Sequence, residues 1–110
     1  MNSNFCLVMT SVSAEHQAVE LAKKVIEFQL GRCVQIIPKI RSIYYWDGEI
    51  CDDDEWLLLI KTRSESIEPL MQHLPEWHPY ELPEMIVLPL IAGYEPYLHW
   101  LSEWKYNGEP

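Results

Sequence analysis

The chain has 110 residues, 48% of them hydrophobic, which suits one domain with a single core. Its formal net charge of −9, with no basic stripe to offset it, argues against nucleic acid as a partner. No apolar run reaches the roughly 18 residues of a membrane span, and three cysteines without CxxC spacing argue against a disulfide framework or a zinc site. We therefore predict one domain over residues 1–110 with no membrane partner, and a cytoplasmic location.

The first predicted elements are a strand and a helix. Asn4–Thr10 is a short, nearly continuous apolar run of the kind found in central strands. Apolar residues then recur at helical spacing, which predicts a helix over about 14–30, with Ser11 or Ser13 as its N-cap. Gly31 is predicted to close this helix in the left-handed conformation.

The stretch Cys33–Thr62 is predicted to form one long β-hairpin. Asp47-Gly48 is a two-residue turn signal, because both turn residues need a positive φ. At about 3.3 Å per residue, each arm would reach roughly 45 Å, far beyond a domain of this length. The exposed aromatic residues of the distal half, Tyr44, Tyr45 and Trp46, would then need cover from another subunit.

This turn also predicts the register of the hairpin. Arg41 falls opposite Asp54 and is expected to form an ion pair with it. Pro38 removes one ladder donor, which predicts an edge position, a bulge or a bend. The acidic run Asp52–Glu55 is a poor strand sequence, and it predicts exposure, a second bulge, or both, rather than a calcium or magnesium loop.

A second helix is predicted to follow the hairpin. Thr62–Glu65 has the pattern of a capping box, and Ser66 is the alternative cap, which would place Pro69 in the first turn. Pro75 and Pro79 are expected to bound the helix.

The remaining chain predicts a strand over Met85–Ala92, a final helix from Tyr94 through Trp104, and a loose tail over 105–110. The resulting order, βαββαβ plus a terminal helix, predicts an α+β fold of the ferredoxin-like class, with an antiparallel sheet backed by helices.

Five blocks of this sequence, in order and spread over most of its length, resemble the CutA family of divalent-cation tolerance proteins. They are Cys33–Pro38, Ser42–Ile50, Leu59–Arg63, His78–Glu84 and Tyr97-Leu98-X-Trp100. The resemblance implies a homotrimer similar in architecture to PII signalling proteins, with long hairpins packed on neighbouring subunits. It also implies a role in tolerance of copper and other divalent cations, without a catalytic reaction or an organic cofactor.

His78 is the residue predicted to bind metal, since imidazole is a common ligand of copper and zinc. Met9 is a soft thioether that suits copper(I), although some relatives carry a cysteine at this position and a histidine in place of Trp77. Cys33 is the third candidate, since it lies in a block shared with the family. The alternatives are that His78 bonds the end of its helix and that the thiols only pack.

A ligand cleft between subunits is the second candidate site. Trp46, Lys61, Thr62, Tyr80 and Glu84 together offer an aromatic wall, a cation, hydroxyl groups and a carboxylate. They predict a pocket for a small anion. The alternative is that the carboxylate of Glu84 makes the pocket favour cations. Three functions stay open: a metal homeostasis protein, a PII-like sensor or signalling adaptor for a small molecule, and, more remotely, an enzyme.

Overall fold

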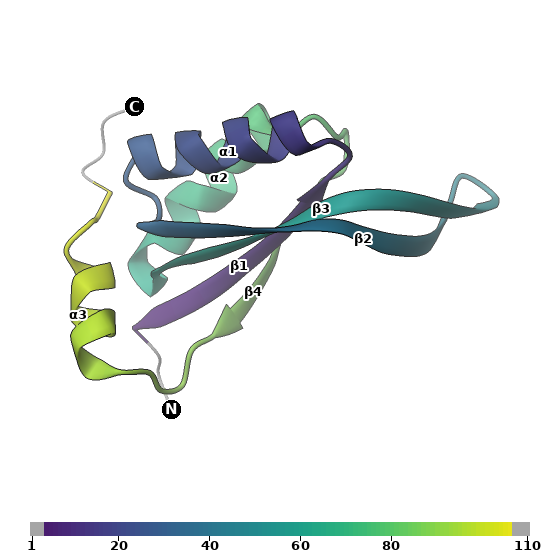
Figure 1. Cartoon of the computed structure of the whole chain (residues 1–110). Coiled ribbons are helices and arrows are strands. Elements are labelled where there is room, and N and C mark those ends of the chain that lie inside the picture. The colour runs from purple at the N-terminus through teal and green to yellow at the C-terminus, as the bar shows by residue number, and fades with distance from the viewer. Residues whose placement is uncertain (1–3, 107–110) are drawn as a thin grey trace.

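The computed structural model describes residues 4–106 and has a four-stranded antiparallel sheet with three α-helices (Figure 1). The order βαββαβ followed by a helix confirms the predicted α+β arrangement. A short 3₁₀ turn precedes the second helix. The elements are β1 (Phe5–Val12), α1 (Glu15–Glu27), β2 (Cys33–Trp46), β3 (Glu49–Arg63), α2 (Ile67–Trp77), β4 (Ile86–Pro89) and α3 (Glu95–Ser102).

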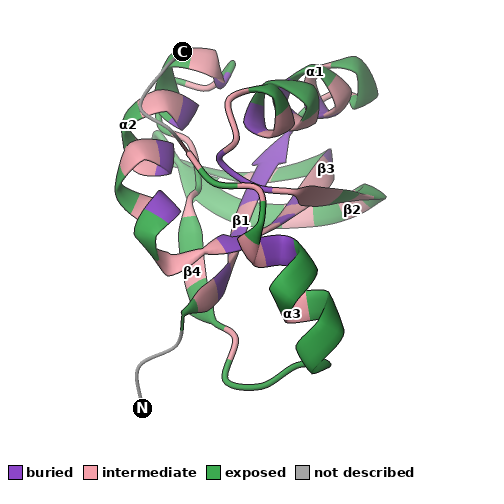
Figure 2. Ribbon diagram, turned by 90° about the vertical axis from the view of Figure 1, so that its left-hand side faces the viewer, coloured by how far each residue is buried: buried purple, intermediate pink, exposed green. Residues whose placement is uncertain are grey.

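The sheet has the strand order β2-β3-β1-β4, and α1 and α2 cover one of its faces (Figures 1 and 2). Side chains alternate along each strand, so every second residue of β1 and β3 points to the helices. These residues form one core with the inner faces of α1 and α2. The buried members are Cys6, Val8, Val12, Ala18, Leu21, Val25, Leu30, Leu58, Ile60, Leu70 and Leu74.

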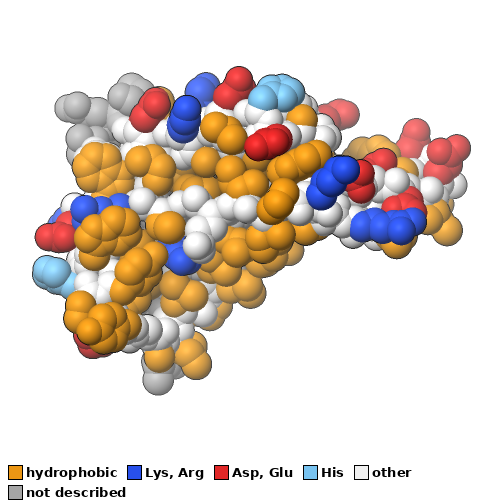
Figure 3. All heavy atoms as spheres, in the orientation of Figure 1, with side chains coloured by type: hydrophobic (Ala, Val, Ile, Leu, Met, Phe, Trp, Pro, Cys, Tyr) orange, Lys and Arg blue, Asp and Glu red, His pale blue; other side chains and the backbone are white. Residues whose placement is uncertain are grey.

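Within the described residues, α1 and α2 leave the opposite face of the sheet uncovered, and only the end of β3 at Lys61 and Arg63 contacts α3 there. We call this face the open face. Its side chains are those that alternate with the core set, and most of them are apolar. They include Leu7, Met9, Cys33, Ile37, Leu57, Leu59, Lys61, Ile86 and Leu88. Figure 3 shows hydrophobic side chains gathered over the body and α3. Ile86 is 48% and Leu88 43% exposed, so the subunit leaves a substantial apolar surface in water.

The end of α1 differs from the prediction. The helix ends at Glu27, and Gln29, with φ 60°, takes the left-handed position that was expected of Gly31. Gly31 serves close packing instead, because a Cβ on it would lie 3.0 Å from Ile60 Cγ2. The N-cap is Ala14 rather than a serine, and the Ser13 hydroxyl bonds Gln17 Oε1 at 3.0 Å.

The hairpin register is as predicted, with Trp46 opposite Glu49 and Arg41 opposite Asp54. The turn residues Asp47 and Gly48 have φ of 50° and 81°, as a turn of this kind requires. The ladder shifts between Ile37 and Ile40, which confirms an irregularity at Pro38.

One expectation about the acidic run was wrong, and one of the two alternatives for the run itself is confirmed. Arg41 bonds Asp52 and not Asp54, with contacts of 2.8 and 2.7 Å, because its long side chain reaches the diagonal neighbour on the same face of the hairpin. Asp52–Asp54 are exposed, as the first alternative predicted, although Glu55 is buried. These three residues pair regularly with β2, so β3 has no bulge there. The bulge lies in β2, where Pro38 cannot donate to the ladder.

The hairpin extends well past the rest of the sheet (Figure 1). β1 ends opposite Trp56, so within residues 4–106 the arms beyond Glu55 pair only with each other. The subunit measures 44 × 29 × 22 Å. Tyr45 is 73% and Ile50 80% exposed on this projecting part.

The C-terminal elements are shorter than predicted. α2 begins after Ser66, the alternative cap position, so Pro69 lies in its first turn, although the Ser66 side chain makes no capping bond. Pro75 lies inside this helix, which runs to Trp77. β4 covers only Ile86–Pro89, which pairs with Cys6–Met9 of β1, and the Leu90 N–H donates to Phe5 O at 3.0 Å just beyond it.

α3 ends at Ser102, because Trp104 leaves the helix and its indole N–H donates to Ile26 O at 2.8 Å. Most of the tail predicted over 105–110 lies outside the described residues. None of the described helices is both long and apolar enough to cross a membrane.

Candidate functional site

His78 is buried just after α2, and both of its ring nitrogens make hydrogen bonds. The backbone N–H of Tyr80 donates to Nδ1 at 3.1 Å, so the ring proton is placed on Nε2. Nε2 donates to the carbonyl of Ser11 at 2.9 Å and lies 3.1 Å from Thr10 Oγ1. His78 therefore ties the end of α2 to the end of β1, and neither nitrogen keeps a lone pair free for a metal.

The electrostatics around His78 favour the neutral ring. Burial lowers the pKa of His78 below 6.5, and the bond to Ser11 and the charge of Glu55 offset this only in part. Tyr80 continues the network, since its hydroxyl donates to Glu55 Oε2 at 2.5 Å. Burial and this bond raise the pKa of Tyr80, so the phenol stays protonated. Glu55 is itself only 8% exposed, and Tyr80 gives this carboxylate a direct partner.

The three predicted metal ligands are not brought together in the described part of one subunit. Met9 lies on the open face, whereas His78 bonds Thr10 on the helix side of the same strand. Cys33 lies at the start of β2 opposite Lys61, also on the open face. Across residues 4–106, no cluster of three or more His, Cys, Asp or Glu side chains is arranged to hold a metal ion.

Three of the five predicted cleft residues, Trp46, Tyr80 and Glu84, line one hollow of about 750 Å³ alongside the projecting hairpin. We call it the hairpin hollow. One wall is the face of the hairpin that carries Trp46, and the other is the extended connection between α2 and β4. The lining residues are Ser11, Ser42, Ile43, Tyr44, Trp46, Glu55, Tyr80, Glu81, Leu82, Pro83 and Glu84.

Strand alternation explains how this hollow forms. Ser42, Tyr44 and Trp46 occupy alternate positions of β2 and share a face with Glu55 of β3. Sequence reasoning missed Tyr44 and Glu55 as partners of Trp46. The alternation in β2 could have identified Tyr44, and the register that the turn predicts could have identified Glu55.

Lys61 and Thr62 do not reach the hairpin hollow within the subunit. They lie six or more residues farther along β3 than Glu55, which is about 20 Å in an extended strand. Thr62 is buried and its hydroxyl donates to Leu30 O at 2.7 Å. Lys61 Nζ lies 5.4 Å from the ring centroid of Tyr97 on α3. The two halves of the predicted cleft therefore occupy opposite ends of the chain's longest strand.

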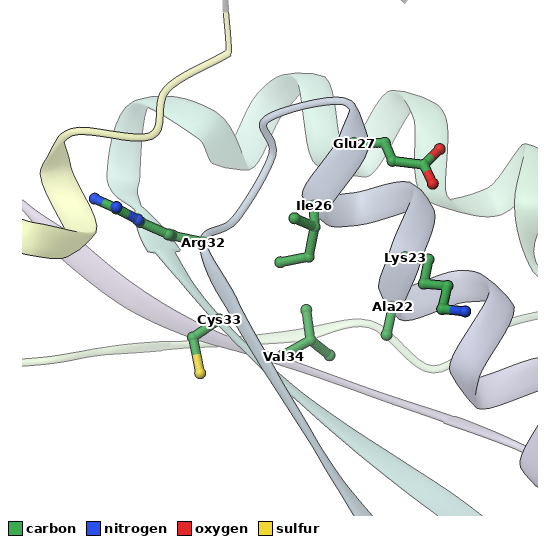
Figure 4. Close-up of a pocket in the computed structure, with 7 residues that line it drawn as sticks. All are labelled: Ala22, Lys23, Ile26, Glu27, Arg32, Cys33 and Val34. Atoms are coloured by element: carbon green, nitrogen blue, oxygen red, sulfur yellow. The ribbon is translucent and has the colours of Figure 1, made fainter.

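A second hollow, of about 460 Å³, lies between α1 and the start of β2. Figure 4 shows that the Cys33 thiol points away from the α1 side chains that line it. Arg32 is directed toward α3, where its guanidinium lies 4.0 Å from the ring centroid of Trp100 and 3.2 Å from Glu103. The polar groups here do not converge on one point, so this hollow lacks the geometry of a ligand site.

The chain matches the family model described as "CutA1 divalent ion tolerance protein" over residues 6–104. It is 40% identical over 97 residues to the divalent-cation tolerance protein CutA of Thermus thermophilus, covering 88% of this chain and 94% of that one. Protein CutA of mouse is 45% identical over 89 residues, which are 81% of this chain. The chain spans only about half of that relative, 50% of its length.

Solved structures give the same result. The structure titled divalent cation tolerance protein (Cut A1) from Thermus thermophilus superposes with a TM-score of 0.88 at 39% identity, and covers 92% of this chain and 98% of its own. CutA1 from Oryza sativa superposes with a TM-score of 0.91 at 35% identity, covering 96% and 97%.

Proposed function

This chain belongs to the CutA1 family of divalent ion tolerance proteins, and from that premise we propose that it acts in tolerance of divalent cations as a homotrimer. The observation that carries the proposal of assembly is the open face together with the projecting hairpin. Both leave large apolar side chains in water, such as Ile50 at 80% and Ile86 at 48% exposure. Surfaces of this kind mark interfaces between subunits.

Three-fold closure is what the resemblance to the family and to PII-like proteins implies. A hairpin that packs on the next subunit makes a head-to-tail contact, which must close into a ring to avoid open filaments. Each open face would then be covered, and the exposed edges of the hairpin would be protected from aggregation.

The assembly is tested by shortening the hairpin symmetrically around Asp47-Gly48 and measuring mass by light scattering after size exclusion. The parent chain should have about three times the mass of one subunit. The shortened chain should dissociate or aggregate, since the deletion removes interface rather than core. A parent chain that elutes with the mass of one subunit at micromolar concentration contradicts the proposal.

For the cation itself, we propose a site between subunits on the open face rather than at His78. Met9 and Cys33 both lie on that face, where a neighbouring subunit would bring further ligands. Their sulfur atoms suit copper better than magnesium. His78 would first have to give up a hydrogen bond to Tyr80 or Ser11.

Equilibrium dialysis of the assembled protein with copper, zinc and magnesium tests this site. Cys33→Ser and Met9→Leu should each reduce the copper that is bound, while His78→Gln should leave it unchanged. If only His78→Gln loses copper binding, the copper ligand is His78 and not Cys33 or Met9.

The comparisons favour neither the small-molecule sensor nor the enzyme, and we propose no catalytic residue and no organic cofactor. A cytoplasmic location stays part of the proposal, supported by three cysteines that are all unpaired thiols.

A further inference from the structure

The chain after α3 forms a strap, residues 103–106, that passes from one side of the sheet to the other. It leaves α3 on the open-face side and runs past the end of the sheet to the layer of α1 and α2 (Figure 1). Trp104 and Tyr106 are half-buried, whereas Glu103 and Lys105 are exposed. The strap therefore presents two aromatic side chains, two residues apart, to one surface.

The surface beneath the strap is a group of three rings, Phe28 just after α1 and His73 and Trp77 from α2, which we call the helix-layer cluster. Phe28 and Trp77 meet edge to face with ring centroids 4.7 Å apart, and His73 stacks on Trp77 at 5.6 Å. Lys24 Nζ lies 5.7 Å from the Trp77 centroid. Because α1 and α2 cover the face opposite the open face, the interface that we propose between subunits leaves this cluster on the outside.

Each aromatic side chain of the strap makes one polar contact with the helices. The indole N–H of Trp104 donates to Ile26 O at 2.8 Å, at the end of α1 where carbonyls lack partners within the helix. The Tyr106 hydroxyl lies 3.4 Å from His73 Nε2, and the two rings are tilted with centroids 6.0 Å apart. The helices thus recognise an indole and, two residues later, a phenol.

The strap is attached almost entirely by side chains. Among the described residues, no backbone group of residues 104–106 bonds another backbone group. The ion pair between Glu103 and Arg32, at 3.2 Å, is exposed on the Glu103 side, and such pairs contribute little. Segments with few buried contacts and no backbone ladder open locally far more often than the whole domain unfolds. Opening would leave the helix-layer cluster as an aromatic patch in water.

We propose that the strap opens locally and that the helix-layer cluster is a docking site for a partner protein, through an extended segment with two aromatic residues two positions apart. In the closed state the strap occupies this site and competes with the partner. Trp104 and Tyr106 themselves show which side chains fit the surface, by ring contacts and by one polar contact each. The residue between them is not recognised, since Lys105 is exposed. Docking here requires neither the cation site nor the trimer proposed above.

The first test is native-state hydrogen exchange of the full chain, in the assembly it forms. The Trp104 indole N–H should exchange at a rate that urea up to about 1 M leaves unchanged, because local opening exposes little surface. The backbone N–H of Leu58, which is fully buried in β3, should exchange faster as urea is added. An indole N–H with the same urea dependence as Leu58 would mean that the strap opens only on global unfolding, and would overturn the proposal.

The second test is an NMR titration of the ¹⁵N-labelled full chain carrying both Trp104→Ala and Tyr106→Ala, which empty the docking site. The probe is the end-blocked peptide Ser-Glu-Trp-Lys-Tyr, the sequence of residues 102–106. We expect saturable shifts at Phe28 and Trp77 with a Kd of about 1 mM. The parent chain should bind the peptide at least about tenfold more weakly, because its own strap competes at a high local concentration.

Two matched comparisons separate docking from general adhesion of aromatic residues. The peptide Ser-Trp-Tyr-Glu-Lys has the same composition with adjacent rings and should bind at least about fivefold more weakly, since its rings point to opposite sides. In the double variant, His73→Ala should weaken binding of the first peptide about fivefold, whereas His16→Ala, at an exposed position of α1, should change it less than about twofold.

Four results of the titration would also overturn the proposal. They are absence of saturable binding up to about 20 mM, equal binding of the two peptides, equal binding by the parent and the double variant, and equal losses in His73→Ala and His16→Ala. If circular dichroism shows that the double variant does not fold, Trp104→Phe replaces it, since this variant removes only the indole N–H bond. It should bind the first peptide more tightly than the parent chain, and binding no tighter than the parent would count against the proposal.

Discussion

The two ends of the β2–β3 hairpin are built from similar residues and have opposite surroundings. At the end near the body, Leu58 and Ile60 of β3 are fully buried. At the distal end of the same ladder, Tyr45 and Ile50 are 73% and 80% exposed. Both ends pair in regular register, but β3 also pairs with β1 near the body, whereas the outer edges of the distal arms have no partner strand in the described part of the chain.

The difference comes from the neighbours of the two ends. Near the body, β1 pairs with the other edge of β3 and α1 covers its inner face. Beyond Trp56 no further strand of the described chain accompanies the hairpin. Apolar and β-branched residues therefore indicated a strand at both ends, but they did not indicate what buries it. At the distal end, the apolar surface is left for a partner.

The largest effect is expected where the hairpin enters the core. Leu58→Ala should lower the free energy of unfolding by about 3 kcal/mol, because it removes methyl groups from a site that close packing keeps from collapsing. Urea denaturation measures the loss, and Leu58→Met, which preserves volume, should cost less than about 1.5 kcal/mol. If Ile50→Ala lowers the free energy of unfolding by a similar amount, the two ends of the hairpin do not differ as described, because the distal end would then be as buried in the assembly as the core.

The hairpin shows how much of this fold could be predicted from local sequence. Asp47-Gly48 determined the turn and the register, and Pro38 marked the position of the bulge. Both depend on backbone preferences of the residues themselves. The partner of Arg41 was not predictable in this way, because two carboxylates on one face compete for a flexible side chain.

The candidate sites were less predictable because their geometry depends on distant parts of the chain. His78 has the chemistry of a ligand, but its partners Thr10 and Ser11 lie almost seventy residues earlier. The left-handed residue after α1 is Gln29 and not Gly31, since contact with Ile60 requires the glycine for packing. Residue type alone made His78 a candidate metal ligand and Gly31 a candidate left-handed residue. Tertiary packing gave each of them a different role.

A smaller effect is expected at the junction of hairpin and body, where His78 titrates. Burial lowers the pKa of His78 in the folded state below 6.5, its value in the unfolded chain. At any pH between the folded-state pKa and 6.5, the unfolded chain therefore binds more protons than the folded chain. The stabilisation is therefore complete above pH 6.5 and is lost as the pH falls toward the pKa of the folded state. Urea denaturation between pH 5 and 8 should show this slope, and His78→Gln should reduce it.

The control for His78 is His16→Gln, which makes the same substitution at an exposed position of α1. An unchanged slope in His78→Gln would mean that other groups of the network, and not this ring, bind the protons.

The smallest effect is expected in the distal half, at the ion pair between Arg41 and Asp52. The bond from Arg41 lowers the pKa of Asp52, so its contribution exists above the usual pKa of a carboxyl group and is lost as acid protonates it. Both groups are exposed, and water and salt screen such pairs strongly. Asp52→Asn should therefore leave the urea midpoint unchanged within error, both at low salt and in molar sodium chloride, as should the neighbouring Asp54→Asn. A clear loss in Asp52→Asn alone that persists in molar salt would show that a neighbouring subunit removes the pair from water, and the two ends of the hairpin would then differ only in which chain covers them.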